Sequence, residues 1–211
     1  MEQNILLEAC VESYEEAIKA EQKGAHRIEL CTRLDLNGLT PDKHLIKQVI
    51  ANVSIPVKVM IRPRGGNFLY STDELKTMKN SIMFCKQTGV KGVVFGVLDK
   101  TSRLNLDQIQ ELAEVSSPLK VTIHKAIDQT PDPVKSLEAL LRIENVLSVL
   151  TSGGALSAYE GHEVIKRMLQ TAKGKIKVIA GGSITKENLA DIHHIISGRE
   201  YHGRRIVGDL C

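Results

Sequence analysis

Short runs of apolar residues, many of them β-branched, alternate with longer helical patterns along the whole chain. Runs of this kind predict buried β-strands, and the stretches between them predict amphipathic helices. The last run is the weakest of the series. The predicted strands are Ile5–Cys10, Arg27–Cys31, Val57–Arg62, Gly92–Leu98, Lys120–His124, Val146–Thr151, Ile176–Ala180 and Glu200–Gly203.

Helix boundary signals stand between these runs. Ser71 and Glu74 have the spacing of a capping box, and Gly89 is a typical residue at a helix end. Thr40 precedes Pro41, and proline favours the first position of a helix. The predicted helices begin near Ser13, Thr40, Ser71, Leu106, Asp132, Ser157 and Thr185.

Strands and helices that alternate in this way predict βαβ units and a parallel sheet. Eight repeats favour a closed (β/α)₈ barrel of the TIM type, and an open doubly wound sheet is the alternative. Such a barrel usually needs about 250 residues, whereas this chain has 211. We therefore expect one α/β domain over residues 1–211, with the last helix missing or vestigial.

Polar and apolar side chains separate onto opposite faces of the first three predicted strands, because successive residues of a strand point in opposite directions. In the first strand, Leu7 and Ala9 share one face and Cys10 lies on the other. The wholly apolar face should pack against the helices, so the mixed face should point into the barrel. The ionisable residues expected in the lumen, near its carboxyl-terminal mouth, are Glu8, Glu29, Lys58, Arg62 and His124.

Charges in a barrel lumen cost several kcal/mol each unless they are paired. Two acids near two bases could balance one another, and one interpretation is a salt-bridge network that only fills the barrel. The other interpretation is an active site, because TIM barrels carry their active sites at this end and perturbed titrating groups gather there. The sequence favours the second interpretation.

Glycine-rich segments follow several of the predicted strands. Arg62-Pro63-Arg64-Gly65-Gly66 combines two guanidinium groups with bare backbone amides, which suits a carboxylate or a phosphate. In TIM barrels, phosphate groups often bind at the loops after strands seven and eight. These glycines could also serve only to turn the chain tightly. The predicted anion-binding residues are Arg62, Arg64, Ser152, Gly153, Gly181 and Gly182.

His124 ends the fifth predicted strand, and Asp128 follows it closely. A histidine beside a carboxylate can shuttle protons, so Glu8, Glu29, His124 and Asp128 are the candidate catalytic residues. Asp128 could equally orient the histidine only to hold the loop. His202 is a weaker second candidate. Lys58 could form a Schiff base, although its depth in the strand and the carboxylates nearby favour a structural ion pair.

Composition excludes several classes of function. A net charge of +3, with three Phe, four Tyr and no Trp, argues against a groove that binds nucleic acid by stacking. No apolar stretch approaches the roughly 18 residues of a membrane span. Met1–Asn4 is acidic and polar, unlike a secretory leader. We therefore expect a cytoplasmic protein with reduced cysteines, no membrane or nucleic-acid partner and no nucleotide cofactor.

Several segments resemble the CutC family of copper homeostasis proteins. They are Leu7–Val11, Gly24–Cys31, Gly38–Pro41, Val59–Gly66, Val94–Gly96 and Leu150–Gly153. The resemblance covers nearly the whole chain and implies a (β/α)₈ barrel, a cytoplasmic homo-oligomer and a role in handling Cu(I). The chain departs from the family pattern at Lys125, where arginine is usual, at Ser183, where a third glycine is usual, and in its short end.

The resemblance places the copper ligands at Cys10 and Cys31. Both cysteines have the strand parity of the lumen face, and adjacent strands lie about 4.8 Å apart. A metal held linearly between two thiolates needs sulfurs roughly 4.5 Å apart, and thiolates favour Cu(I). Two functions therefore stay open. The protein binds Cu(I) through these cysteines, or it is a barrel enzyme that acts on a small anionic substrate by acid–base chemistry.

Overall fold

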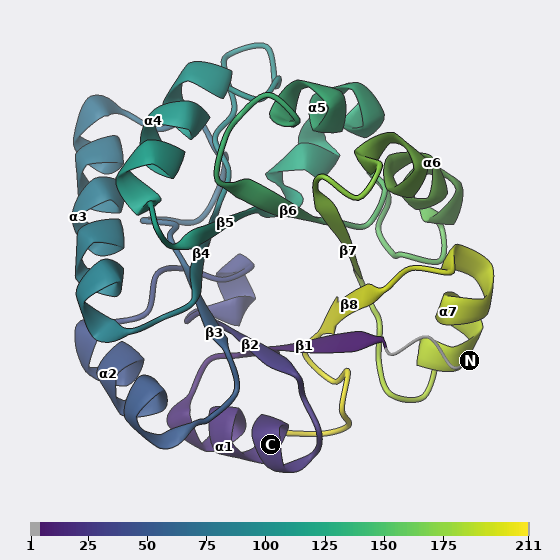
Figure 1. Cartoon of the computed structure of the whole chain (residues 1–211), viewed down its shortest axis with the longest axis horizontal. Helices are drawn as coiled ribbons and strands as arrows, with labels where there is room; N and C mark the ends of the chain where they lie inside the picture. Colours follow the sequence, from purple (N-terminus) through teal and green to yellow (C-terminus); the bar gives the residue numbers. More distant parts are fainter. Residues whose placement is uncertain (1–4, 211) are drawn as a thin grey trace.

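Eight parallel strands form a closed barrel in the computed structural model, which describes residues 5–210. Met1–Asn4, on which the expectation about a leader rests, and Cys211 lie outside the described residues. The strands pair in chain order, and β8 closes the barrel against β1. The helices surround the barrel as an outer layer (Figure 1). The predicted (β/α)₈ fold is therefore confirmed.

Strands and helices alternate throughout the described chain. The strands are β1 (Leu6–Val11), β2 (Arg27–Leu30), β3 (Val57–Met60), β4 (Gly92–Phe95), β5 (Lys120–Ile123), β6 (Val146–Thr151), β7 (Lys177–Gly181) and β8 (Glu200–Gly203). The helices are α1 (Tyr14–Gln22), α2 (Lys43–Asn52), α3 (Thr72–Thr88), α4 (Leu106–Ser116), α5 (Pro133–Leu140), α6 (His162–Ala172) and α7 (Leu189–Ile196). Short 3₁₀ helices follow β2 and β5, at Leu34–Leu36 and Lys125–Gln129.

Some helix starts follow the sequence signals and others do not. At α3, Ser71 and Glu74 form the expected capping box, and Gly89 ends the helix in the left-handed region. At α2, Asp42 caps the helix instead of Thr40. The hydroxyl of Thr40 instead accepts a hydrogen bond of 2.7 Å from the backbone N–H of Arg62, so it serves a tertiary contact.

The last two helices begin later than the sequence predicts. Ser157 and Glu160 exchange both capping hydrogen bonds, at 3.2 Å each, yet α6 begins only at His162. Likewise α7 begins at Leu189 rather than near Thr185. After β8, the described residues 204–210 form no helix, and Ile206, Val207 and Leu210 pack into the outer core. The described part of the chain thus contains no helix after β8, in line with the expectation from the sequence.

The alternation of side chains in the strands is confirmed. Ala9, Ile28 and Val59 belong to the large apolar core between the barrel and its helices. Cys10, Cys31, Met60 and Val94 form a separate apolar cluster. None of the helices in the described chain is both long and apolar enough to cross a bilayer.

Candidate functional site

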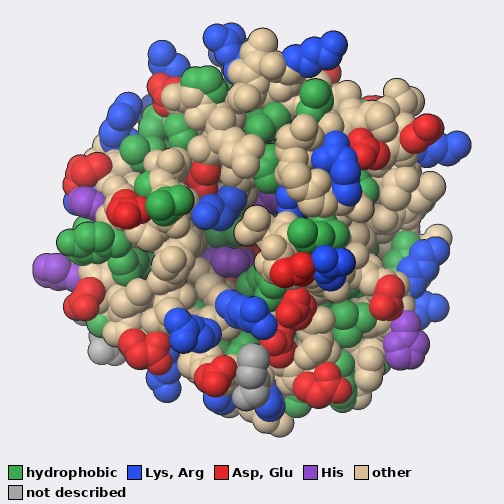
Figure 2. All heavy atoms as spheres, turned by 180° about the vertical axis from the view of Figure 1, so that it is seen from behind, with side chains coloured by type: hydrophobic (Ala, Val, Ile, Leu, Met, Phe, Trp, Pro, Cys, Tyr) green, Lys and Arg blue, Asp and Glu red, His purple; other side chains and the backbone are tan. Residues whose placement is uncertain are grey.

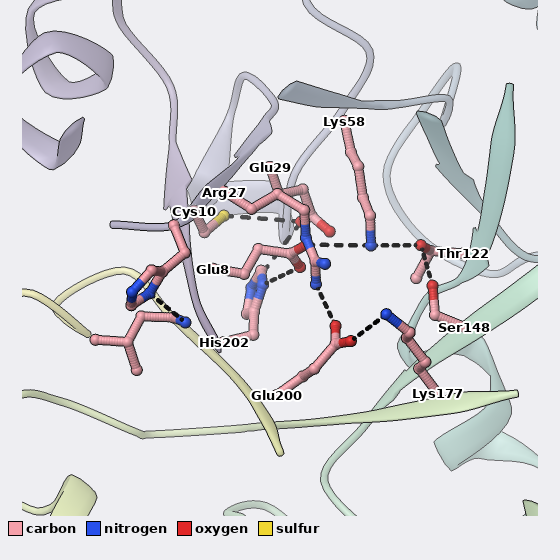
Figure 3. A network of polar contacts seen from close by, with 12 residues as sticks. Glu8, Cys10, Arg27, Glu29, Lys58, Thr122, Ser148, Lys177, Glu200 and His202 are labelled. Carbon is pink, nitrogen blue, oxygen red and sulfur yellow. Dashed lines mark hydrogen bonds and ion pairs between the residues drawn. The ribbon is translucent and has the colours of Figure 1, made fainter. Parts of the chain in front are cut away.

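A network of buried charges fills the lower part of the lumen. Glu8, on β1, is fully buried and lies at the centre of the network. One of its oxygens accepts a hydrogen bond from Nε of Arg27 and lies 3.2 Å from Nζ of Lys58, and the other lies 3.0 Å from Nδ1 of His202. Figure 3 shows these side chains converging from neighbouring strands.

The network continues around the barrel through further polar groups. The guanidinium of Arg27 donates a hydrogen bond of 2.6 Å to Glu200, which also lies 3.2 Å from Lys177. The ammonium of Lys58 donates a hydrogen bond of 2.8 Å to the Thr122 hydroxyl, which lies 2.7 Å from that of Ser148. Each charge of this network therefore has a partner, as a low-dielectric interior requires.

The surroundings of Glu8 hold it ionised. Burial alone would raise the pKa of this carboxyl, but the charge of Lys58 and the hydrogen bond with His202 lower it well below its usual range. Burial lowers the pKa of Lys58, although Glu8 opposes this shift. Lys58 is thus already committed to an ion pair with Glu8. This favours the structural interpretation over a Schiff base.

A cavity of about 820 Å³ lies above this network. Its lining comes from the carboxyl ends of the strands and the loops after them, from Cys10 and Glu29 below to Ser183 and Arg204 above. Figure 2 shows a hollow near the middle of this face, with histidine inside it and charged side chains around it. The site therefore lies at the end of the barrel that the sequence predicts.

Three groups able to bind a metal meet at the bottom of the cavity. The sulfur of Cys10, a carboxylate oxygen of Glu29 and an imidazole nitrogen of His202 all lie within 4.8 Å of one another. A fourth group is close, because Sγ of Cys31 lies 3.7 Å from Sγ of Cys10. Cys10, Glu29 and Cys31 are buried, whereas His202 is partly exposed to the cavity.

Protonation in this cluster is set by neighbouring groups. The hydrogen bond with Cys31, together with burial, raises the pKa of the Cys10 thiol well above its usual range. Burial raises the pKa of Glu29. Burial opposes the charging of His202, but the charge of Glu29 and the hydrogen bonds with Cys10 and Glu8 outweigh it and raise the pKa of this imidazole well above its usual range.

The two arginines predicted to bind an anion have different surroundings. Arg62 is buried and lines the cavity, and its guanidinium donates to the carbonyl oxygens of Leu36, Gly38 and Gly66. Arg64 forms a salt bridge of 2.5 Å with Glu74 and does not line the cavity formed by the described residues. The structure therefore brings only Arg62 to the site.

His124 and Asp128 both line the cavity, but they do not form a pair. The carboxylate of Asp128 accepts hydrogen bonds from the hydroxyl and backbone of Ser152, from the hydroxyl of Thr151 and from the N–H of Gly154. It thereby fastens the loop after β6. The ring of His124 packs against Phe68, with centroids 4.7 Å apart. Burial and the charge of Arg62 lower the pKa of His124 to about 3.

The predicted glycines act mainly through close packing. Ser152 and Gly182 line the cavity, whereas Gly153 and Gly181 do not, within the described residues. A Cβ on Gly153 would lie 2.3 Å from the carbonyl oxygen of Gly161, and φ of Gly153 is +73°. Its N–H donates to the Thr151 hydroxyl at 2.8 Å. A lack of space for a side chain therefore explains this glycine without any ligand.

Sequence reasoning gave too little weight to one strand. His202 and Glu200 both come from β8, the weakest of the predicted strands. In the lumen, His202 contacts Glu8 and Glu200 pairs with Arg27. Arg27 has the lumen parity in the sequence, yet it was absent from the residues expected there. Applying the same alternation to β8 would have placed Glu200 and His202 on one face.

The fold and this site define a class: a TIM barrel whose lumen holds a buried ion network beneath a cavity with thiol, imidazole and carboxylate groups. Residues 5–207 match the model of the CutC family. The chain therefore belongs to the CutC family, as the resemblance in its motifs implied.

Relatives of the chain carry the corresponding names. The human copper homeostasis protein cutC homolog is 45% identical over 197 residues, which are 93% of this chain and 72% of that protein. The CutC family protein of Histophilus somni is 39% identical over 93% of this chain and 80% of its own length.

Solved structures agree with the fold. A CutC crystal structure from Streptococcus agalactiae has a TM-score of 0.90 at 31% identity and covers 96% of this chain and 99% of its own. A dihydrodipicolinate synthase from Bacillus anthracis has a TM-score of 0.67 at 12% identity, covering 96% of this chain and 70% of its own. The second likeness concerns the barrel fold alone.

Proposed function

We propose that this protein binds Cu(I) in the barrel mouth through Cys10 and Cys31, as part of copper homeostasis. The observation that carries the proposal is the pair of thiols 3.7 Å apart, next to the imidazole of His202. Thiolate and imidazole are soft or borderline ligands, and soft ligands favour Cu(I) over hard cations. The human and mouse relatives are named copper homeostasis proteins, which supports this assignment.

The spacing of the sulfurs favours a bent site with more than two ligands. With metal–sulfur bonds of about 2.3 Å, a separation of 3.7 Å corresponds to an S–Cu–S angle of roughly 107°. A linear site would need the sulfurs almost 1 Å further apart, by the same bond length. An angle near 107° leaves room for a third ligand. The imidazole of His202 lies beside Cys10 and can supply a nitrogen ligand once it has lost its extra proton.

Binding at this site displaces protons. Metal ligands must be deprotonated, while the raised pKa values of Cys10 and His202 keep both groups protonated at neutral pH. The carboxylate of Glu29, whose pKa burial raises, lies 4.0 Å from Nε2 of His202, so a released proton has an acceptor close by. The proposed site therefore exchanges protons for copper.

The proposal also implies a reducing location. Cys10, Cys31 and Cys85 are free thiols, as expected of a protein that works in the cytoplasm. A thiol pair that binds Cu(I) must stay reduced, so cytoplasmic action and copper binding support one another. We propose the cytoplasm as the place of action.

Anaerobic competition with a Cu(I) chelator tests the function. The full chain is compared with its Cys10→Ser and Cys31→Ser variants, and we expect each change to weaken binding at least about a hundredfold, or about 2.7 kcal/mol. Cys85→Ser is the matched control, because Cys85 is also buried and free but lies in α3.

The outcomes separate clearly. X-ray absorption of the copper complex should show two sulfur ligands and at least one lighter ligand. Equal affinity in wild type and both lumen variants would remove copper from this site. A loss of the same size in Cys85→Ser would show that the cysteine effects are not specific to the thiol pair.

A further inference from the structure

Arg62 is a buried cation without an acidic partner. It is 3% exposed, and three of its N–H groups donate to the backbone carbonyls of Leu36, Gly38 and Gly66. Among residues 5–210, no carboxylate lies within ion-pair distance of it. Burial raises the pKa of Tyr70 beside the guanidinium, so this phenol supplies no negative charge either. A buried charge is costly unless it is compensated, so this position calls for an anion.

His124 offers a donor next to Arg62. Its Nδ1 accepts a hydrogen bond of 3.2 Å from the N–H of Ala126, so the neutral ring carries its proton on Nε2. That Nε2 is buried and has no hydrogen-bond partner among the described residues. The ring of Phe68 contacts both the His124 ring and, at 4.9 Å, the Arg62 guanidinium. The two donors therefore belong to one corner of the cavity.

Two further residues of the same cavity extend this pattern. Lys125 lines it and has neither an ion pair nor a side-chain hydrogen bond in the described part of the chain. Glu29 also lines it, and Oε2 of Glu29 is a buried acceptor without a partner there. Met60 and Leu150 contribute apolar groups to the same lining. Cationic donors and an unused acceptor thus share one cavity with apolar walls.

We propose that this cavity binds a small organic anion that carries a hydroxyl group besides its carboxylate or phosphate. Arg62 and His124 hold the oxyanion with N–H donors, Lys125 adds positive charge, and Oε2 of Glu29 accepts a hydrogen bond from the hydroxyl. A volume of about 820 Å³ suits such a molecule and far exceeds one metal ion. The oxyanion donors are separate from the copper site, because Arg62, His124 and Lys125 are not among the proposed Cu(I) ligands, whereas Glu29 lies within the candidate metal cluster.

Calorimetric titration of the copper-free full chain tests the proposal with three probes. Glycerol 3-phosphate and glycerate carry a hydroxyl group with a phosphate or a carboxylate, and glycerol is the neutral control. We expect one of the two anions to bind saturably at millimolar concentrations or below, and glycerol not to bind. The anion that binds more tightly shows whether the site prefers a phosphate or a carboxylate. If neither anion binds more tightly than glycerol, the proposal is wrong.

Variants locate the binding. Arg62→Lys should weaken anion binding at least about tenfold because the lysine ammonium cannot reproduce the fork of donors. The matched control is Arg64→Lys on the same loop, whose arginine pairs with Glu74 outside the cavity. Should Arg62→Lys unfold, His124→Phe and Lys125→Ala decide in its place. Unchanged binding in those variants, or an equal loss in Arg64→Lys, overturns the assignment.

The Cys10→Ser, Cys31→Ser double variant separates this proposal from the copper function. Anion binding should persist in this variant, because the two thiols that it lacks are not among the groups proposed to hold the anion. Loss of anion binding in the double variant would contradict the independence of the two sites. Loss of Cu(I) binding with retained anion binding is the expected result.

Discussion

His202 and Glu8 are 194 positions apart in the chain, yet Nδ1 of His202 lies 3.0 Å from Oε1 of Glu8. The contact exists because β8 pairs with β1 and closes the barrel, with Glu8 opposite His202 in the register. The same imidazole lies within the cluster of Cys10 and Glu29. Closure of the sheet therefore joins the buried ion network to the candidate metal ligands.

If His202 is the third copper ligand, its loss should weaken Cu(I) binding less than loss of a thiol. We expect His202→Gln to lower the affinity about tenfold, against about a hundredfold for either cysteine, since two sulfurs remain. Chelator competition measures this. His193→Gln is the control, because His193 lies in α7 and contacts Tyr201 instead. An effect as large in His193→Gln would refute a specific role for His202.

Copper affinity should rise with pH. Cys10 and His202 both have raised pKa values, so both must lose a proton when they bind the metal. For each proton displaced, the affinity rises about tenfold per pH unit as long as the pH is below the pKa of that group. We expect at least one such proton between about pH 6 and 8. Competition titrations at several pH values, corrected for the chelator, measure the slope. A flat profile would contradict thiol ligation by Cys10.

Removing the charge of Glu8 should destabilise the fold severely. Glu8→Gln leaves Arg27 and Lys58 buried without their central counter-charge, and breaking such a pair costs about 3–5 kcal/mol. Urea unfolding measures the loss. Glu163→Gln is the control, because its pair with Lys166 is exposed and surface pairs contribute about 0–1 kcal/mol. Similar losses in the two variants would contradict the central role of Glu8.

His124 should make the fold sensitive to acid. Its pKa is about 3 in the folded protein and about 6.5 in an unfolded chain, so the unfolded state binds the extra proton between these values. The contribution of neutral His124 to the unfolding free energy is therefore fully present above about pH 6.5. It is lost as the pH drops toward 3, and the loss is at most roughly 5 kcal/mol.

The difference between wild type and His124→Gln isolates this effect from other titrating groups. The unfolding free energy of the variant should depend less steeply on pH between about 6.5 and 5, a range that lies above the ordinary pKa of a glutamate in an unfolded chain. Urea unfolding across this range measures both curves. Parallel curves would show that His124 is not buried in its neutral form.

Gly153 should tolerate no side chain. In Gly153→Ala, the new Cβ meets the backbone oxygen of Gly161, whereas the same change at Gly174 meets nothing within 4 Å. Both glycines have positive φ, so Gly174→Ala reports the conformational cost alone, about 1–2 kcal/mol. We expect Gly153→Ala to cost about 1–3 kcal/mol more. Thermal or urea unfolding compares the two, and equal losses would refute the clash.

The sequence by itself determined the barrel and the inward face of its first strands. The alternation of Glu8 and Cys10 with Leu7 and Ala9 is local information, because residue parity fixes the face of a strand. Capping signals such as Ser71 with Glu74 are local as well. For this reason the fold, and the presence of ionisable groups in the lumen, could be predicted.

Only the tertiary structure decided which of these groups meet. Arg64 and Arg62 look equivalent in the sequence, but Glu74 on α3 pairs with Arg64 and leaves Arg62 at the cavity. Asp128 follows His124 closely, yet its carboxylate bonds to the loop after β6. The partner of a side chain depends on register and barrel closure, which join residues far apart in the chain and leave no local pattern in the sequence.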